Sequence, residues 1–127
     1  MSSEKQSTGT IGWCDLTVPD AERVRDFYAS VVGWKTQAVE MDGYHDYCMV
    51  PPAGDEPAAG VCHARGANSK LPAQWLIYIR VENLTVALQR CVQQGGAVVD
   101  GPRSMVGQQV CVIRDPAGAH VALVGAS

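Results

Sequence analysis

Four residues with chemically useful side chains stand in two similar stretches of the sequence. Trp13 and Asp15 belong to one predicted strand, and Tyr78 and Arg80 belong to another. In each stretch these residues alternate with apolar ones, so all four are expected on the sheet face opposite the apolar set. An indole, a phenol, a carboxylate and a guanidinium on one concave face could bind a planar or charged small molecule. The alternative is a filled interior in which Asp15 pairs with Arg80 or Tyr78.

A second polar group stands in the segment CHARGAN, where His63, Arg65 and Asn68 follow a short predicted strand. Small-molecule sites gather at strand ends and in the loops after them, and an arginine there can bind a carboxylate or a phosphate. We therefore take His63 and Arg65 as candidate ligand-binding residues. The alternative is a solvated linker.

Two amphipathic helices are predicted to support these strands. In the first, Asp20 is a predicted N-cap and Gly33 a predicted left-handed end. An apolar stripe of helical period lies between them, made of Val24, Phe27, Tyr28, Val31 and Val32. The pattern returns 63 positions later, since Leu16, Asp20 and Gly33 align with Ile79, Asn83 and Gly96. The second stripe is made of Leu84, Ala87, Leu88, Cys91 and Val92. An internal duplication follows from this correspondence.

Each copy is predicted to fold as a βαβββ module. The first module is expected over residues 11–66 and the second over 74–124, joined by a linker over 67–73 and preceded by a disordered tail over 1–10. The dipeptide Gly101-Pro102 is expected to end a strand. The predicted fold class is α+β, with a curved, barrel-like mixed sheet that carries its helices on the outer face.

Composition limits the classes of function. The 127 residues suffice for one domain, and the formal net charge of −3 gives no basic surface for nucleic acid. No apolar run approaches the length of a membrane span, and the five cysteines lack metal-binding spacing. We therefore expect a cytoplasmic protein with reduced cysteines, no nucleic-acid partner and no membrane partner.

Two motifs carry a resemblance to a known family. The phrase FYASVVGW in the first copy and the phrase IRDPAGAHVALV near the end resemble the vicinal oxygen chelate superfamily. This superfamily includes glyoxalase I, extradiol dioxygenases and bleomycin-resistance proteins. The resemblance implies the duplicated βαβββ fold, and within the superfamily it points to the small bacterial glyoxalase-like proteins. It also implies units that pair within or between chains, and we expect a homodimer.

Enzymes of this superfamily usually hold a divalent metal through His, Gln or Glu from the first and last strands of each copy. The resemblance places three of those positions at Trp13, Leu76 and Ala122, whose side chains cannot bind a metal. The fourth falls near Val61 to His63, where the strand register is left open. We therefore expect no metal and no other cofactor.

The resulting hypothesis is a metal-free, glyoxalase-like protein that binds an unidentified small molecule in the concavity of its sheet. The ligand-binding candidates are Trp13, Asp15, Tyr78, Arg80, His63 and Arg65. The alternative is a lyase or a dioxygenase-like enzyme with an atypical or metal-independent site, built on Cys62 or His63 or on Asp15 as a general base. A purely structural role is the third possibility, because a fold does not decide a function.

Overall fold

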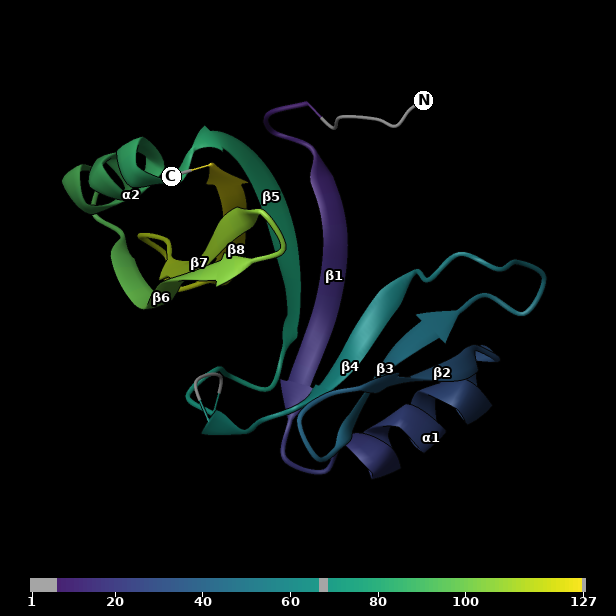
Figure 1. Ribbon diagram of the computed structural model, residues 1–127. Helices are drawn as coiled ribbons and strands as arrows, with labels where there is room; N and C mark the ends of the chain where they lie inside the picture. The colour runs from purple at the N-terminus through teal and green to yellow at the C-terminus, as the bar shows by residue number, and fades with distance from the viewer. Residues whose placement is uncertain (1–6, 67–68, 127) are drawn as a thin grey trace. The chain divides into compact units, whose positions relative to one another are not determined.

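The computed structural model describes residues 7–66 and 69–126, and within them the chain forms two compact modules (Figure 1). The first module comprises Cys14–Trp75. The second comprises the residues up to Trp13 together with those from Leu76 onward. Strand β1 (Ile11–Val18) therefore contributes its first residues to the second module and its remaining residues to the first.

The first module follows the predicted βαβββ order. After β1 come α1 (Ala21–Val32), β2 (Lys35–Glu40), β3 (His45–Val50) and β4 (Ala59–His63). The strands β2, β3 and β4 pair antiparallel, and β4 pairs parallel with β1. Helix α1 lies against one face of this sheet (Figure 1).

The second module repeats this arrangement. It contains β5 (Trp75–Asn83), α2 (Leu84–Gln93), β6 (Ala97–Met105), β7 (Gln108–Arg114) and β8 (His120–Ala126). The strands β6, β7 and β8 pair antiparallel, and β8 pairs parallel with β5. The prediction of an α+β fold made of two βαβββ modules is confirmed.

Alternate residues of β1 and β5 pack in the cores of the two modules. In the first module Leu16 and Val18 pack with Met49 and Val61 under α1. In the second module Ile79 and Val81 pack on the buried cluster of Leu84, Cys111 and Leu123. The residues between them, including Asp15 and Tyr78, therefore face away from the helices, as period two requires.

The apolar stripe predicted for α1 is only partly buried. Val24 and Tyr28 pack against the core, whereas Phe27, Val31 and Val32 are 56%, 65% and 50% exposed. The predicted stripe is wider than the contact that α1 makes, because a helix on a sheet buries only the side chains nearest to it.

The helix ends agree closely with the expected caps. The side chain of Asp20 accepts a hydrogen bond from the Arg23 backbone N–H, and that of Asn83 accepts one from the Val86 backbone N–H. Gly33 ends α1 at a φ of 89°. After α2 the left-handed residue is Gly95, with a φ of 95°, and the alignment of Gly33 with Gly96 is therefore wrong by one position.

Strand β6 differs from the prediction. It was expected to end at Gly101-Pro102, but it continues to Met105 and pairs with β7 along its whole length. The pairing of β6 with β7 shifts its register twice, once on each side of Asp100. A proline is tolerated at a bulge in an edge strand, where its missing N–H costs no ladder hydrogen bond.

Regular hydrogen bonding begins before β1. The N–H of Gly9 donates to the Arg80 carbonyl at 2.7 Å, and the Arg80 N–H donates to the Thr10 carbonyl at 2.9 Å. Residues 1–6 of the predicted tail lie outside the described residues. Among the described helices, neither is long and apolar enough to cross a bilayer.

Candidate functional site

A small pocket in the second module brings together three of the predicted site residues. Trp13 from β1 and Tyr78 and Arg80 from β5 line a cavity of about 160 Å³. The other lining residues are Gly12, Met105, Gln108 and Val124. The register of β5 with β8 explains the grouping, because Arg80 lies opposite Val124 on the face turned away from α2.

This pocket can bind a flat, polar-edged group. Trp13 and Tyr78 offer aromatic faces, Arg80 offers a fixed positive charge, and Gln108 offers an amide that can donate or accept. Gln108 and Met105 were missed by the sequence analysis. Alternation along β7 puts Gln108 on the same face as Val110 and Val112, but only the pairing of β7 with β8 brings that face to Tyr78.

Asp15 lies in the first module, on the sheet face opposite α1. Its carboxylate lies close enough to Cys62 to raise the pKa of that thiol, although burial is the larger cause. Asp46, which is buried, adds its own charge and a hydrogen bond in the same direction. Cys62 therefore keeps its proton at neutral pH and is a poor nucleophile.

His63 lies at the end of β4 beside the buried carboxylate of Asp46. Asp46 Oδ1 accepts the His63 backbone N–H at 2.9 Å and lies 3.4 Å from the ring nitrogen Nδ1. The His63 ring meets the Tyr44 ring edge-on at 5.7 Å, and the Arg65 guanidinium lies over Tyr44 at 4.0 Å. The predicted group of His63 and Arg65 is thus joined through Tyr44. Asn68 lies outside the described residues.

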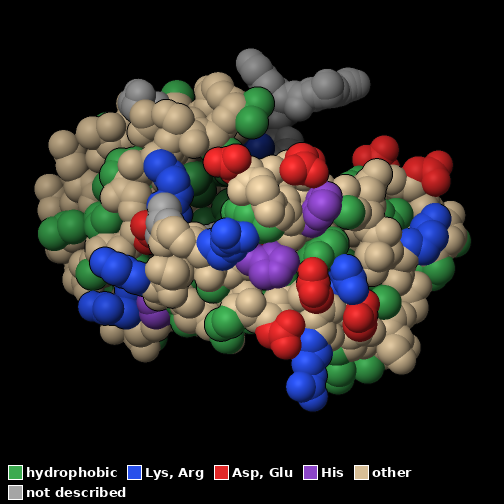
Figure 2. Space-filling view, turned by 60° about the horizontal axis from the view of Figure 1, so that its bottom comes forward, with side chains coloured by type: hydrophobic (Ala, Val, Ile, Leu, Met, Phe, Trp, Pro, Cys, Tyr) green, Lys and Arg blue, Asp and Glu red, His purple; other side chains and the backbone are tan. Residues whose placement is uncertain are grey.

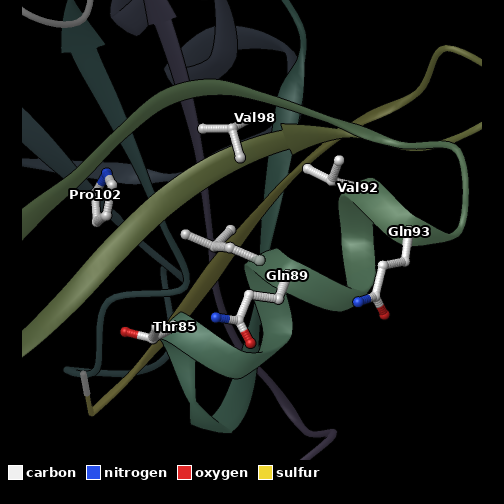
Figure 3. Close-up of a pocket in the computed structure, with 7 residues that line it drawn as sticks. Thr85, Gln89, Val92, Gln93, Val98 and Pro102 are labelled. Atoms are coloured by element: carbon white, nitrogen blue, oxygen red, sulfur yellow. The ribbon is translucent and has the colours of Figure 1, made fainter.

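A larger hollow of about 560 Å³ lies between α2 and β6. Figure 3 shows Val92 of α2 and Val98 of β6 facing the same space, with Thr85, Gln89 and Gln93 along the helix and Pro102 at the far end. Val92 and Val98 are 59% and 42% exposed. The sequence analysis placed Val92 in the apolar stripe of its helix, and the structure leaves this residue exposed.

Comparison with family models identifies the superfamily of this chain. Residues 10–123 match the model of the Glyoxalase/Bleomycin resistance protein/Dioxygenase superfamily. The chain belongs to this superfamily. Its βαβββ modules, derived above from the caps and the alternation, are those that the resemblance implied.

Relatives with curated sequences are considerably longer. The protein CFP32 of Mycobacterium tuberculosis (strain CDC 1551 / Oshkosh), provisionally named a glyoxylase, is 31% identical over 126 residues, which cover 91% of this chain and 45% of that protein. The anthracycline biosynthesis protein DnrV of Streptomyces peucetius is 27% identical over 116 residues, covering 91% of this chain and 41% of that protein. The chain therefore spans less than half the length of these relatives.

Solved structures share the fold at low identity. A superfamily member from Vibrio splendidus 12B01 aligns with a TM-score of 0.59 at 13% identity, over 91% of this chain and 99% of that one. A methylmalonyl-CoA epimerase in complex with methylmalonyl-CoA and NH4+ aligns with a TM-score of 0.56 at 16% identity, over 95% and 96% of the two chains. Identities this low support the fold alone.

The strand register identifies the residue at the fourth metal position of the superfamily. Asp15 and Tyr78 are equivalent in the two copies, and they lie opposite Gly60 and Ala122 respectively. The position left open in the sequence analysis is therefore Gly60. Together with Trp13, Leu76 and Ala122, it completes a set of four residues whose side chains offer no metal-binding atom. Within residues 7–66 and 69–126, no group of three or more His, Cys, Asp or Glu side chains is arranged to hold a metal ion. The residues present do not fit the superfamily's metal.

Proposed function

We propose that this chain is a metal-independent member of its superfamily that binds a small planar molecule carrying a negative charge. The proposal rests on the pocket formed by Trp13, Tyr78 and Arg80, which lies on the strands that supply metal ligands elsewhere in the superfamily. Where a metal would polarise oxygen atoms, this chain offers two aromatic faces and a guanidinium.

The size of the pocket limits the group that it can enclose. A cavity of about 150 Å³ is known to hold one benzene ring. The volume of about 160 Å³ therefore suits one aromatic ring, and a larger ligand would extend beyond the enclosed space. Arg80 and Gln108 provide the polar contacts that fix the orientation of such a ring. The name of DnrV as an anthracycline biosynthesis protein adds support for an aromatic ligand.

Tryptophan fluorescence tests this proposal with benzoate and an anthraquinone carboxylate as probes. We expect a saturable change in emission that is lost in Trp13→Phe and kept in Trp34→Phe, because Trp34 packs with Tyr28 and Trp75 in the first module. Arg80→Gln should weaken binding about 10-fold or more, since a charge-assisted hydrogen bond is lost. Arg114→Gln, near the opposite end of β7 from Gln108, is the matched charge control.

Equal effects of Arg80→Gln and Arg114→Gln would reject the pocket as the binding site. Chromatography of the recovered probe separates binding from catalysis. A chemically altered probe would favour the alternative of a metal-independent enzyme, for which Asp15 is the expected base.

We also propose that the chain forms a homodimer. Phe27, Val31 and Val32 expose apolar surface along one side of α1, and exposed apolar surface of this kind favours association. Light scattering at micromolar concentration should give twice the chain mass, and a clean monomer mass would reject the dimer.

We also propose a cytoplasmic location, and the unpaired state of all the described cysteines supports it.

A further inference from the structure

Strand β2 forms an unprotected edge of the first module. Among the described strands it pairs with β3 alone, and all six of its residues are exposed. It follows β3 in one continuous register and carries charge only at its two ends, on Lys35 and Glu40. Proteins usually protect such an edge with a proline, a bulge or a central charge, because an open edge can pair with another chain.

Strand β6, the edge strand of the second module, has this protection. It contains Pro102 between Gly101 and Arg103, and its register with β7 shifts on both sides of Asp100. A bulge bends an edge strand, and a proline removes a backbone donor from it. The difference indicates that β2, unlike β6, can accept a further strand.

A hydrogen bond next to β2 shows which of its backbone groups point outward. The Met41 N–H donates to the Tyr44 carbonyl at 2.8 Å, so the backbone of Met41 faces β3. Hydrogen-bonded and non-hydrogen-bonded pairs alternate along an antiparallel ladder. The residues that direct their N–H and C=O groups away from β3 are therefore Thr36, Ala38 and Glu40.

The other side of β3 agrees with this assignment. The Met49 carbonyl accepts the Ala58 N–H at 2.8 Å, so Met49 turns its backbone groups away from β2, and its partner there is Thr36. The register also places the side chains of Thr36 and Ala38 on the α1 face of the sheet. They lie opposite Met49 and Tyr47, which belong to the core packed against α1.

We propose that β2 pairs antiparallel with β2 of a second copy of the chain, about a two-fold axis through Ala38. This inference rests on the homodimer proposed above and names its surface. In this register Ala38 lies opposite Ala38 of the second copy, and Thr36 lies opposite Glu40 of the second copy. All three outward residues of each strand then form hydrogen-bonded pairs. An axis between two residues would place an outward residue opposite an inward one, and an axis through a neighbouring residue would leave one of the three unpaired within β2.

Charge and side-chain size fit this pairing. The two Glu40 side chains lie at opposite ends of the joined strands, so like charges do not face each other. Thr36 and Ala38 are small and leave room beside the axis on the face where α1 packs. Both α1 helices, with their exposed apolar residues, would lie on that one face of the joined sheet. Figure 2 shows basic and acidic side chains interspersed on one face of the molecule, so no field of a single sign opposes association there.

Disulfide formation in Ala38→Cys tests the register. Opposed residues of a hydrogen-bonded pair have Cα atoms about 5.5 Å apart, a separation that a disulfide can span. We expect a covalent dimer on a non-reducing gel after mild oxidation. Val39→Cys is the matched control, because Val39 is also exposed on β2 but lies opposite Gln37 of the second copy in this register. It should give no more covalent dimer than the wild type, which accounts for the native cysteines.

Sedimentation equilibrium of Ala38→Lys tests the association itself. Two lysines opposite each other repel, so the dimer dissociation constant should rise about 10-fold or more. Val39→Lys adds the same charge to the other face of the strand, away from the axis, and should change the constant much less. Circular dichroism establishes that both variants are folded.

The outcomes separate this surface from the homodimer as such. A monomeric wild-type protein would overturn both. A wild-type dimer with the same dissociation constant in Ala38→Lys would overturn the β2 surface and leave the homodimer in place. Equal amounts of covalent dimer from Ala38→Cys and Val39→Cys would overturn the register.

Discussion

The two modules share one side of their sheets and differ on the other. On the helix side, Leu16 and Val18 in the first module have apolar counterparts in Ile79 and Val81. On the opposite side, the register aligns a row of three residues in each module. The row is Cys48, Gly60 and Asp15 in the first module and Val112, Ala122 and Tyr78 in the second. The helix side is held constant by packing, and the other side is free to diverge.

The last strands of the modules show the same contrast. If Gly60 corresponds to Ala122, three residues further on His63 corresponds to Gly125. A Cβ built on Gly125 would lie 2.3 Å from the Val81 carbonyl oxygen, so that position has no room for any side chain. The irregular pairing of β5 with β8 between Arg80 and Asn83 accompanies this close approach. The polar group of His63, Asp46 and Tyr44 therefore has no equivalent in the second module.

The largest expected effect tests the shared side. Met49 is fully buried in the first module, and Leu84 is 1% exposed in the second. We expect Met49→Ala and Leu84→Ala each to lower the free energy of unfolding by about 2–5 kcal/mol, because each leaves a cavity in a closed core. Urea unfolding followed by circular dichroism measures both. A loss below about 1 kcal/mol in either variant would show that its module relaxes around the cavity.

The next prediction tests the close approach at Gly125. Gly125→Ala should destabilise the protein by about 1–3 kcal/mol, because the new methyl group overlaps the Val81 carbonyl oxygen. Gly54→Ala is the matched control, since a Cβ there meets nothing within 4 Å. If the two variants unfold at the same urea concentration, β5 and β8 can separate at little cost, and the contrast with His63 weakens.

These contrasts show which features the sequence could supply. Period two placed Leu16, Val18, Ile79 and Val81 correctly, because alternation is a local property of one strand. The identity of the fourth metal position and the contribution of Gln108 to the pocket depended on pairing between strands. Pairing brings together residues far apart in the chain, and the alternation within one strand does not say which residue of a distant strand lies opposite.

The helices show a similar limit. The caps Asp20 and Asn83 were predicted correctly because each acts on a backbone N–H three residues away. The exposure of Phe27 and Val92 was not predicted, because helical period identifies an apolar side but not how much of it a neighbouring sheet covers. Gly95 and Gly96 are both glycines, so the sequence could not decide which one takes the left-handed conformation.

An aromatic cluster in the first module provides a smaller effect. The Trp75 indole N–H donates to the Tyr28 hydroxyl at 3.1 Å, and their rings meet edge-on at 5.2 Å. Tyr28→Phe should cost about 1 kcal/mol, since it removes the hydroxyl while the ring contact persists. Val86→Ala, on the partly exposed side of α2, serves as a surface reference. A Tyr28→Phe variant as stable as the wild type would show that water replaces the hydroxyl.

The smallest predicted effect compares the two helix caps. Asn83 Oδ1 accepts the Val86 N–H at 2.9 Å, whereas Asp20 Oδ1 accepts the Arg23 N–H at 3.3 Å. A hydrogen bond weakens as it lengthens, so Asn83→Ala should cost about 1 kcal/mol and Asp20→Ala less. Urea midpoints at constant pH measure both, with Asn83→Asp and Asp20→Asn as variants that keep a capping oxygen. If Asp20→Ala costs more than Asn83→Ala, the carboxylate charge at the start of α1 outweighs the geometry of its hydrogen bond. Added salt would then reduce the difference, because salt screens the attraction between that charge and the helix dipole but leaves a short hydrogen bond intact.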